Sequence, residues 1–155
     1  MTAIQIRPAV LEDLVPLRKL MFSYIVDFYK SKKPESDKVE ELIQHLLDHH
    51  TDGKQFVAET EDGTLAGFAT LYYSFSTTRV KKIAILNDLF VDSSFRGAGL
   101  GEELFQYVLA YTKKEGFAYM SWQTAADNKP AQALYSKMGG KNINHEWIHY
   151  EIEHN

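Results

Sequence analysis

Apolar side chains recur every three to four residues in four stretches of the chain, which is the spacing that one face of an α-helix requires. In the first stretch, Leu14, Leu17 and Met21 follow this spacing. The predicted helices span residues 12–29, 39–49, 100–114 and 129–138. Gly116 follows the third stretch and Gly139 the fourth, and glycine commonly ends a helix at such a position.

Between these stretches the apolar residues alternate with polar ones or form short continuous runs, as is typical of β-strands. The predicted strands span residues 4–8, 56–60, 65–75, 83–91, 117–124 and 148–152. The run 83–91 is the most apolar of them, so we expect it at the centre of the sheet. This order of elements predicts one α/β domain over residues 1–155, with three layers and a mixed sheet.

Composition and charge exclude several classes of function. The chain has 155 residues, no cysteine and a formal net charge of −4. Disulfides, thiolate metal sites and cysteine nucleophiles are therefore excluded, and the acidic excess argues against a nucleic-acid partner. No apolar run approaches membrane-spanning length and the N-terminus lacks a signal-peptide pattern. We therefore expect a cytoplasmic protein that has no membrane partner.

A glycine-rich segment follows the most apolar strand and opens the predicted helix 100–114. It consists of Arg96, Gly97, Ala98, Gly99, Leu100 and Gly101. Small residues leave backbone N–H groups uncovered at the positive end of the helix, which favours phosphate binding. Arg96 adds a cation that can form paired hydrogen bonds to an anion. The sequence therefore predicts a site for a phosphorylated small molecule.

Two familiar phosphate-binding loops do not fit this segment. A Walker loop ends in Gly-Lys-Ser/Thr, but here Gly101 is followed by Glu102 and Glu103. A dinucleotide-binding fingerprint requires a third glycine at the position of Glu102. The spacing of Arg96, Gly99 and Gly101 instead resembles the coenzyme A loop of the GNAT superfamily of N-acetyltransferases.

A second motif strengthens this resemblance. Asn128, Ala131, Tyr135 and Gly139 match the family pattern Asn-x-x-Ala-x-x-Leu/Phe-Tyr-x-x-x-Gly on a predicted helix. The first three stand on one helix face, and the small Ala131 allows a ligand to approach closely. The segment 86–91 is most similar to the spermidine/spermine and thialysine acetyltransferase branch. The resemblance implies a GNAT-like fold in which the strand 83–91 splays from the strand 117–124.

The resemblance also implies roles for individual residues in binding acetyl-CoA as cosubstrate. Backbone groups of Leu89, Phe90 and Val91 would contact the pantetheine arm, and residues 96–101 would hold the pyrophosphate. Asn128 would bind the arm from the other side, with Ala131 beside it, and Tyr135 would protonate the leaving thiolate. The family resemblance further implies a homodimer and no metal ion.

The chain departs from the branch pattern at Asn87, where that branch has a glutamate that acts as base. Asp88 is adjacent, but strand alternation directs it to the opposite face unless a bulge intervenes. The base is then Asp88, a chain of waters or no protein group. The candidate acceptor-binding residues are Tyr24, Asp27, Asn87, Asp88 and Trp122.

The expected reaction is transfer of an acetyl group to the primary amine of a small molecule, such as a polyamine, a diamine or an amino-acid-like acceptor. We expect direct attack in a ternary complex, because the chain has no cysteine to carry the acetyl group. Two alternatives remain open. One is acetylation of a protein or aminoacyl-tRNA amine, and the other is a non-catalytic acyl-CoA sensor.

Overall fold

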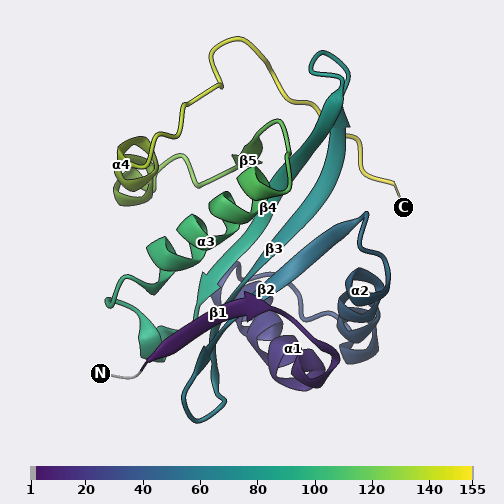
Figure 1. Cartoon of the computed structure of the whole chain (residues 1–155), viewed down its shortest axis with the longest axis vertical. Coiled ribbons are helices and arrows are strands. Elements are labelled where there is room, and N and C mark those ends of the chain that lie inside the picture. The colour runs from purple at the N-terminus through teal and green to yellow at the C-terminus, as the bar shows by residue number, and fades with distance from the viewer. Residues whose placement is uncertain (1–2, 155) are drawn as a thin grey trace. The chain divides into compact units, whose positions relative to one another are not determined.

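The computed structural model describes residues 3–154 and contains one five-stranded mixed sheet (Figure 1). The strands lie in chain order across the sheet, and all neighbours are antiparallel except the last pair, which is parallel. The strands are β1 (Ile4–Pro8), β2 (Gly53–Thr60), β3 (Leu65–Ser76), β4 (Lys81–Val91) and β5 (Met120–Trp122). The predicted mixed α/β fold is confirmed.

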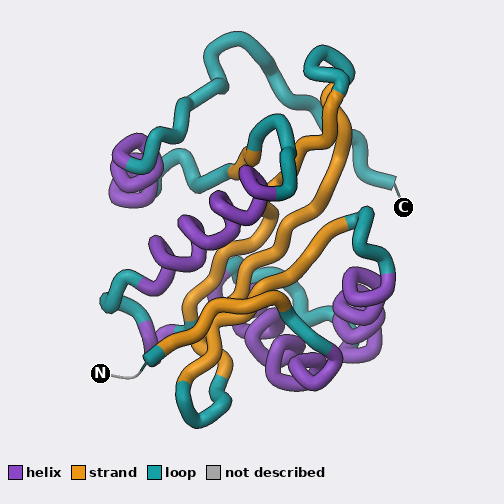
Figure 2. Tube along the Cα trace, viewed as in Figure 1, coloured by secondary structure: helices purple, strands orange, loops and turns teal. Residues whose placement is uncertain are grey.

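Helices cover both faces of this sheet (Figures 1 and 2). The longer helices of the chain are α1 (Leu14–Phe22), α2 (Ser36–Asp48), α3 (Leu100–Lys114) and, in a separate C-terminal part, α4 (Lys129–Lys137). The short ones are η1 (Leu11–Asp13), the π-helix η2 (Ser23–Phe28) and η3 (Ser93–Phe95). α1 and α2 pack on one face of the sheet and α3 on the other.

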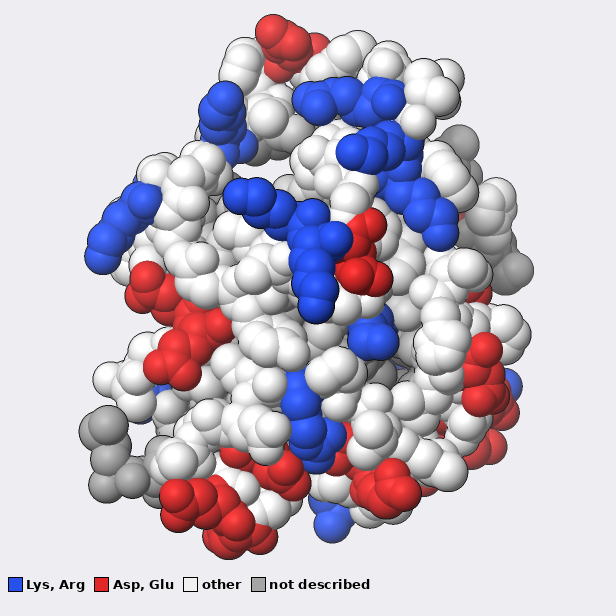
Figure 3. Space-filling view, viewed as in Figure 1, with Lys and Arg blue, Asp and Glu red and all other residues white. Residues whose placement is uncertain are grey.

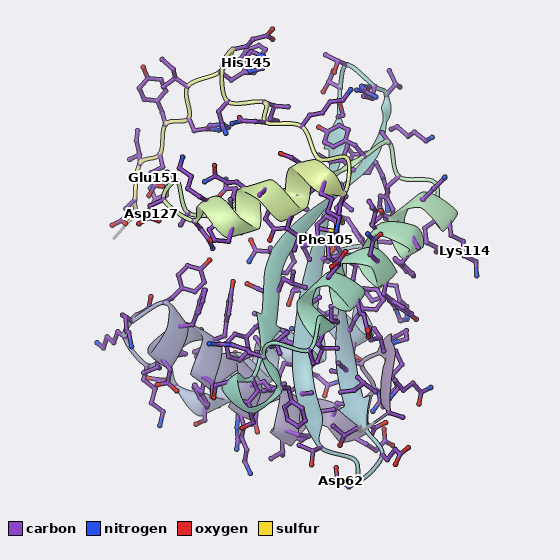
Figure 4. The ribbon with its side chains drawn as sticks, turned by 90° about the vertical axis from the view of Figure 1, so that its left-hand side faces the viewer. Asp62, Phe105, Lys114, Asp127, His145 and Glu151 are labelled. Carbon is purple, nitrogen blue, oxygen red and sulfur yellow. The ribbon has the colours of Figure 1, made fainter. Side chains whose placement is uncertain are left out.

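The two faces of the sheet carry different parts of the core. Leu17, Ile43 and Phe68 belong to a buried cluster between the sheet and the pair α1 and α2. On the other face, Leu104 and Phe105 of α3 are buried, and the side chain of Phe105 points from the helix toward the sheet (Figure 4). Each fully buried side chain of this size contributes about 1.5–3 kcal/mol to folding.

The predicted helix 12–29 is not continuous. It begins as a 3-10 turn, becomes α1 and ends in the π-helix η2, where the backbone N–H of Tyr29 donates to the Tyr24 carbonyl at 3.0 Å. Helical periodicity identified this segment correctly, but side-chain spacing does not distinguish α from π hydrogen bonding. The wider turn brings Tyr24 into edge contact with Phe68 and Phe90, with ring centroids 5.5 and 5.6 Å apart.

The structure divides into two compact units, Met1–Trp122 and Gln123–Asn155. The second unit contains α4 and no strand among its described residues. The predicted strand 148–152 is therefore wrong as a statement about this structure, because the segment makes no strand pairing. Alternation gives a segment two different faces, but a strand also needs a hydrogen-bonded neighbour. The expectation of one domain over residues 1–155 stays a prediction.

Charged side chains are unevenly distributed on the face that Figure 3 shows. Acidic side chains gather toward the end of the β2–β3 hairpin, and basic ones gather over the C-terminal part of α3 and the nearby strands. In the described part of the chain, no helix has the length and apolar character needed to cross a membrane.

Candidate acetyl-CoA and acceptor site

The glycine-rich loop joins the end of β4 to the start of α3 by way of η3. Gly97 and Gly99 have φ angles of 89° and 81°, a backbone conformation that side chains with a Cβ rarely adopt. A Cβ added at either position would meet no other atom within 4 Å, so the space around both glycines is open. The loop is exposed and leads directly into the first turn of α3. This geometry leaves room for a phosphate group at the helix N-terminus.

Arg96 is held at the base of this loop. Its Nε donates a hydrogen bond to the Val91 carbonyl oxygen at 2.9 Å, and its guanidinium lies 5.4 Å from the centre of the Phe90 ring. The fixed cation and the positive end of α3 both favour an anion at the loop. An open hollow of about 600 Å³ beside Gly99 is lined by Glu102 and Glu103, so it does not suit a phosphate.

The pairing of β4 with β5 ends before β4 does. Only Ala84, Ile85 and Leu86 pair with β5, while β4 continues to Val91. Leu89 pairs with Ala69 of β3 and shares its sheet face, whereas Phe90 pairs with Phe68 and lies on the face of α1 and α2. The early end of the β4–β5 ladder agrees with the splayed strand pair expected for a GNAT-like fold.

A β-bulge interrupts β4 at Asn87. Leu86 pairs with Leu71 and Asp88 pairs with Thr70, so Asn87 has no partner position on β3. The extra residue places Leu86 and Asp88 on opposite faces, although they are only two residues apart. The expectation from simple alternation is therefore corrected. The amide nitrogen of Asn87 donates to the Asp88 carboxylate at 3.0 Å, so the two side chains lie together.

Asp88 is part of a buried polar cluster beneath α1. Gln55 donates from its amide nitrogen to the Thr70 hydroxyl at 3.1 Å, and Gln55, Thr70 and Asp88 are all at least 91% buried. Burial raises the pKa of Asp88, while hydrogen bonds from Thr70, Tyr24 and Asn87 act in the opposite direction. A carboxyl group whose pKa is raised in this way can accept a proton closer to neutral pH than a solvated one.

The Asp88 carboxyl group affects the pKa values of two nearby tyrosines. The Tyr24 hydroxyl donates to the Asn87 carbonyl oxygen at 3.4 Å, so η2 is linked to the bulge. Burial, and then the charge of Asp88, raises the pKa of Tyr24 well above its usual range. Burial and the charge of Asp88 also raise the pKa of Tyr72 to about 12. Both tyrosines therefore remain neutral hydrogen-bond donors at physiological pH.

The second unit carries the other predicted motif. The Asn128 side-chain oxygen accepts a hydrogen bond from the Ala131 backbone N–H at 3.2 Å and so caps α4. Tyr135 lies on the same helix, and Gly139 has a φ angle of 96° just after the helix ends. The cap is confirmed as an element of structure, whereas the coenzyme contacts of Asn128 and Ala131 and the acid role of Tyr135 stay predictions.

Comparisons with known proteins agree with this geometry. Residues 17–140 match the family described as Acetyltransferase (GNAT) family. The chain belongs to this GNAT family. It is 32% identical over 134 residues to the uncharacterized N-acetyltransferase YhfO of Bacillus subtilis, covering 86% of this chain and 87% of that protein. Membership makes the protein an acetyl-CoA-dependent N-acetyltransferase.

Two further proteins place the chain within the GNAT family. The D-amino-acid N-acetyltransferase HPA3 of Saccharomyces cerevisiae is 31% identical over 83 residues, which is 54% of this chain and 52% of that protein. A crystal structure of a probable acetyltransferase superposes with a TM-score of 0.83 at 25% identity, covering 97% of this chain and 98% of the other. The fold is therefore shared across nearly the whole length.

The structure brings together only some of the predicted acceptor residues of this GNAT protein. Tyr24, Asn87 and Asp88 meet at the bulge. Asp27 lies on η2 with an exposed side chain. Trp122 pairs with Leu86 and packs edge-on against Phe105, with ring centroids 4.9 Å apart, so it lies on the α3 face. No group of metal-binding side chains occurs in the described part of the chain.

Sequence reasoning did not single out three residues beside the candidate acceptor site. Gln55 and Thr70 are buried polar residues in apolar strands. A polar residue in such a strand indicates a buried hydrogen-bond partner, and this was the signal in the sequence that could have identified both residues. Helical spacing over residues 12–29 also predicts Phe28 on the apolar face of one continuous helix, but Phe28 lies in the π-helix η2 and is 55% exposed. Its ring lies beside Tyr29, with centroids 5.2 Å apart.

Proposed function

We propose that the protein transfers the acetyl group of acetyl-CoA to the primary amine of a small molecule, by direct attack in a ternary complex. The bulge at Asn87 is the observation that carries this proposal, because it turns Asp88 to the face where Tyr24 borders an exposed aromatic surface. The yeast relative supports a small acceptor, since its name describes acetylation of D-amino acids.

The proposed coenzyme site uses groups from both motifs. Residues 96–101 would bind the pyrophosphate through backbone N–H groups and the Arg96 cation. Strand backbone groups at Leu89, Phe90 and Val91 would bind the pantetheine arm along the part of β4 that β5 does not pair. The family resemblance gives Asn128 and Ala131 the proposed role of coenzyme contacts as well.

Asp88 is the proposed proton acceptor. It would take the role of the glutamate base that the related branch has at the position of Asn87. An alkylamine has a pKa near ~10.4 and arrives as an ammonium ion, so one proton must leave before its lone pair can attack. Asp88 would take that proton, directly or through one water. The Leu89 backbone N–H would then donate to the developing oxyanion, and Tyr135 would give its phenolic proton to the departing sulfur as the C–S bond breaks. The proton that the nitrogen still has to lose after its attack would pass to the Tyr135 oxygen through water, which restores the phenol.

The decisive experiment combines binding and turnover. Calorimetry should detect acetyl-CoA binding to the unmodified protein, and Gly99→Val should weaken it by at least about tenfold, because valine is strained at a positive φ and blocks the phosphate. Gly63→Val is the matched control, since Gly63 has a φ of 89° in the β2–β3 turn. Unchanged affinity in Gly99→Val would refute the loop assignment.

A screen of small amines that reads thiol release then tests the acceptor class. Turnover of at least one small primary amine is the expected result. Coenzyme binding with no turnover on any amine would instead favour the acyl-CoA sensor. Turnover only on a protein or aminoacyl-tRNA would favour a macromolecular acceptor.

A further inference from the structure

An exposed aromatic surface lies next to the buried carboxyl group of Asp88. It consists of Tyr24, Phe28 and Tyr29, which we call the aromatic wall. Tyr24 contacts Tyr29 edge-on with ring centroids 5.0 Å apart, and Phe28 contacts Tyr29 at 5.2 Å. Phe28 and Tyr29 are 55% and 59% exposed. Exposed aromatic rings beside a buried polar group are typical of a ligand site.

A run of positive charge follows the aromatic wall directly. Lys30, Lys32 and Lys33, which we call the basic rim, are all exposed. The segment is held against η2, because the Ser31 backbone N–H donates to the Ile25 carbonyl at 3.0 Å. Lys33 also lies against the Phe22 ring, with its Nζ 5.2 Å from the ring centre. The Ser31 hydrogen bond therefore links the basic rim to η2, whereas Lys33 lies against the last residue of α1.

Burial and chain order separate these groups. Asp88 is buried, the rings of Phe28 and Tyr29 are more than half exposed, and the exposed basic rim follows them in the chain. Asp27 is the single acidic residue between Tyr24 and Lys33. An ammonium group is attracted to Asp88, an apolar chain to the wall and an anion to the rim.

We propose that the acceptor is an ω-amino acid, in which an apolar chain separates the reacting amine from a carboxylate. This inference rests on the proposed function. A polyamine would bring a second ammonium group to the basic rim and be repelled. An α-amino acid reacting at its α-amine would hold its carboxylate close to Asp88. Of these three acceptor classes, the ω-amino acid is the one whose two charges match both Asp88 and the basic rim.

Three probes with the same six-carbon chain test this order: 6-aminohexanoate, hexylamine and 1,6-diaminohexane. Each is assayed with acetyl-CoA by thiol release, and kcat/KM is compared. We expect 6-aminohexanoate to exceed 1,6-diaminohexane by about tenfold, with hexylamine between them, because each exposed charge pair contributes up to about a factor of five. Shorter and longer ω-amino acids are assayed alongside, so that chain length does not limit the result.

Charge reversal on the rim provides the specific control. The double variant Lys30→Glu/Lys32→Glu should reduce the preference for the carboxylate by more than about tenfold, so that the diamine becomes the better substrate. Lys114→Glu makes the same kind of change at the exposed C-terminal end of α3, on the other face of the sheet, and should leave the preference unchanged (Figure 4). High salt should reduce the preference in the unmodified protein.

The outcomes separate this inference from the function on which it rests. Absence of acetyl-CoA binding in calorimetry would refute the proposed function itself. Suppose instead that acetyl-CoA binds and that kcat/KM for the diamine or for hexylamine equals or exceeds kcat/KM for 6-aminohexanoate. The ω-amino-acid inference is then wrong, and the proposed acetyl transfer stands. Binding without acetylation of any ω-amino acid would also overturn the inference.

Discussion

At the residue scale, the environment of one carboxyl group determines the expected pH dependence. Burial raises the pKa of Asp88, so the proposed base is protonated and inactive at low pH and becomes competent as pH rises. The activity of the unmodified protein should therefore rise through the pKa of Asp88 and then level off. In Asp88→Asn that plateau should disappear, and the rate should follow the neutral fraction of the amine, about tenfold per pH unit.

The measurement is a profile of kcat/KM against pH for both proteins with one amine. Thermal melting of the variant shows whether the fold is retained. If Asp88→Asn keeps the plateau, Asp88 is not the base. The proton of the amine would then leave through a chain of waters, or the amine would bind in its neutral form.

Tyr135 allows a second test at this scale, in the second unit. Tyr135→Phe removes only the hydroxyl group, so packing is kept while the proposed acid is lost. We expect turnover to fall by about 10²–10⁴-fold with little change in acetyl-CoA affinity. Steady-state kinetics and calorimetry on the same preparation measure both quantities. Turnover within a factor of two of the unmodified protein would make Tyr135 a structural residue.

Sequence reasoning was strongest where backbone conformation requires a particular residue. The glycine-rich segment was predicted to open the helix 100–114, and it does so, with Gly97 and Gly99 at positive φ angles. It was weakest at Asn87 and Asp88, where strand alternation alone predicts opposite faces. A bulge is a shift in the pairing of two strands, so it cannot be predicted from the residues of one strand alone.

At the scale of elements, an ion pair links β1 to the start of the helical segment. Arg7 donates from its two terminal nitrogens to the Asp13 carboxylate at 2.8 and 2.9 Å, and the Val10 backbone N–H donates to the same group at 2.8 Å. Burial by itself would raise the pKa of Asp13, but these hydrogen bonds outweigh it and lower the pKa below 3.8. The charged form is therefore the one that the fold stabilises.

Asp13→Asn should lower the free energy of unfolding by about 1.5–3 kcal/mol at pH 7, because a charged, bidentate partner of Arg7 is lost. Since the pKa of Asp13 is lowered in the folded state, its stabilising contribution is present above pH 3.8 and is lost as pH falls through the folded value. The difference in the free energy of unfolding between the unmodified protein and Asp13→Asn should therefore be smaller at acidic pH. Urea unfolding at pH 7 and pH 3 measures it, with Glu12→Gln as the exposed neighbouring control.

Helices were predicted more accurately than strands, because their hydrogen bonds are local. The helix 100–114 was predicted with its observed bounds, because its hydrogen bonds are local and its apolar face is clear. The strand 148–152 was predicted from alternation at Ile148, Tyr150 and Ile152, but its described residues have no paired strand. A helix completes its own hydrogen bonds, whereas a strand depends on another segment.

At the scale of the whole molecule, the homodimer expected from the family resemblance stays a prediction, and the C-terminal segment offers a way to test it. Trp147, Ile148, Tyr150 and Ile152 are between 71% and 89% exposed, an unusual amount of apolar surface for one segment. If this surface is buried in a homodimer, Tyr150→Ser/Ile152→Ser should weaken dimerisation by more than about tenfold.

Sedimentation velocity over a range of protein concentrations measures that change. Val80→Ser provides a comparable control, since Val80 is 88% exposed in the turn between β3 and β4. A protein that sediments as a monomer at every concentration would show that the expected homodimer is wrong. A dimer that the double variant leaves intact would place the interface elsewhere.

The bulge at Asn87 also bears on how this chemistry could be gained or lost during evolution. Deleting the single codon for Asn87 would make Leu86 and Asp88 neighbours, and their present partners Leu71 and Thr70 are already neighbours on β3. An ordinary ladder would result, with every other pair between the two strands preserved. The carbonyl that now receives the Tyr24 hydroxyl would be gone. One codon therefore separates a regular β3–β4 ladder from one in which the Tyr24 hydroxyl is bonded to a bulge in β4.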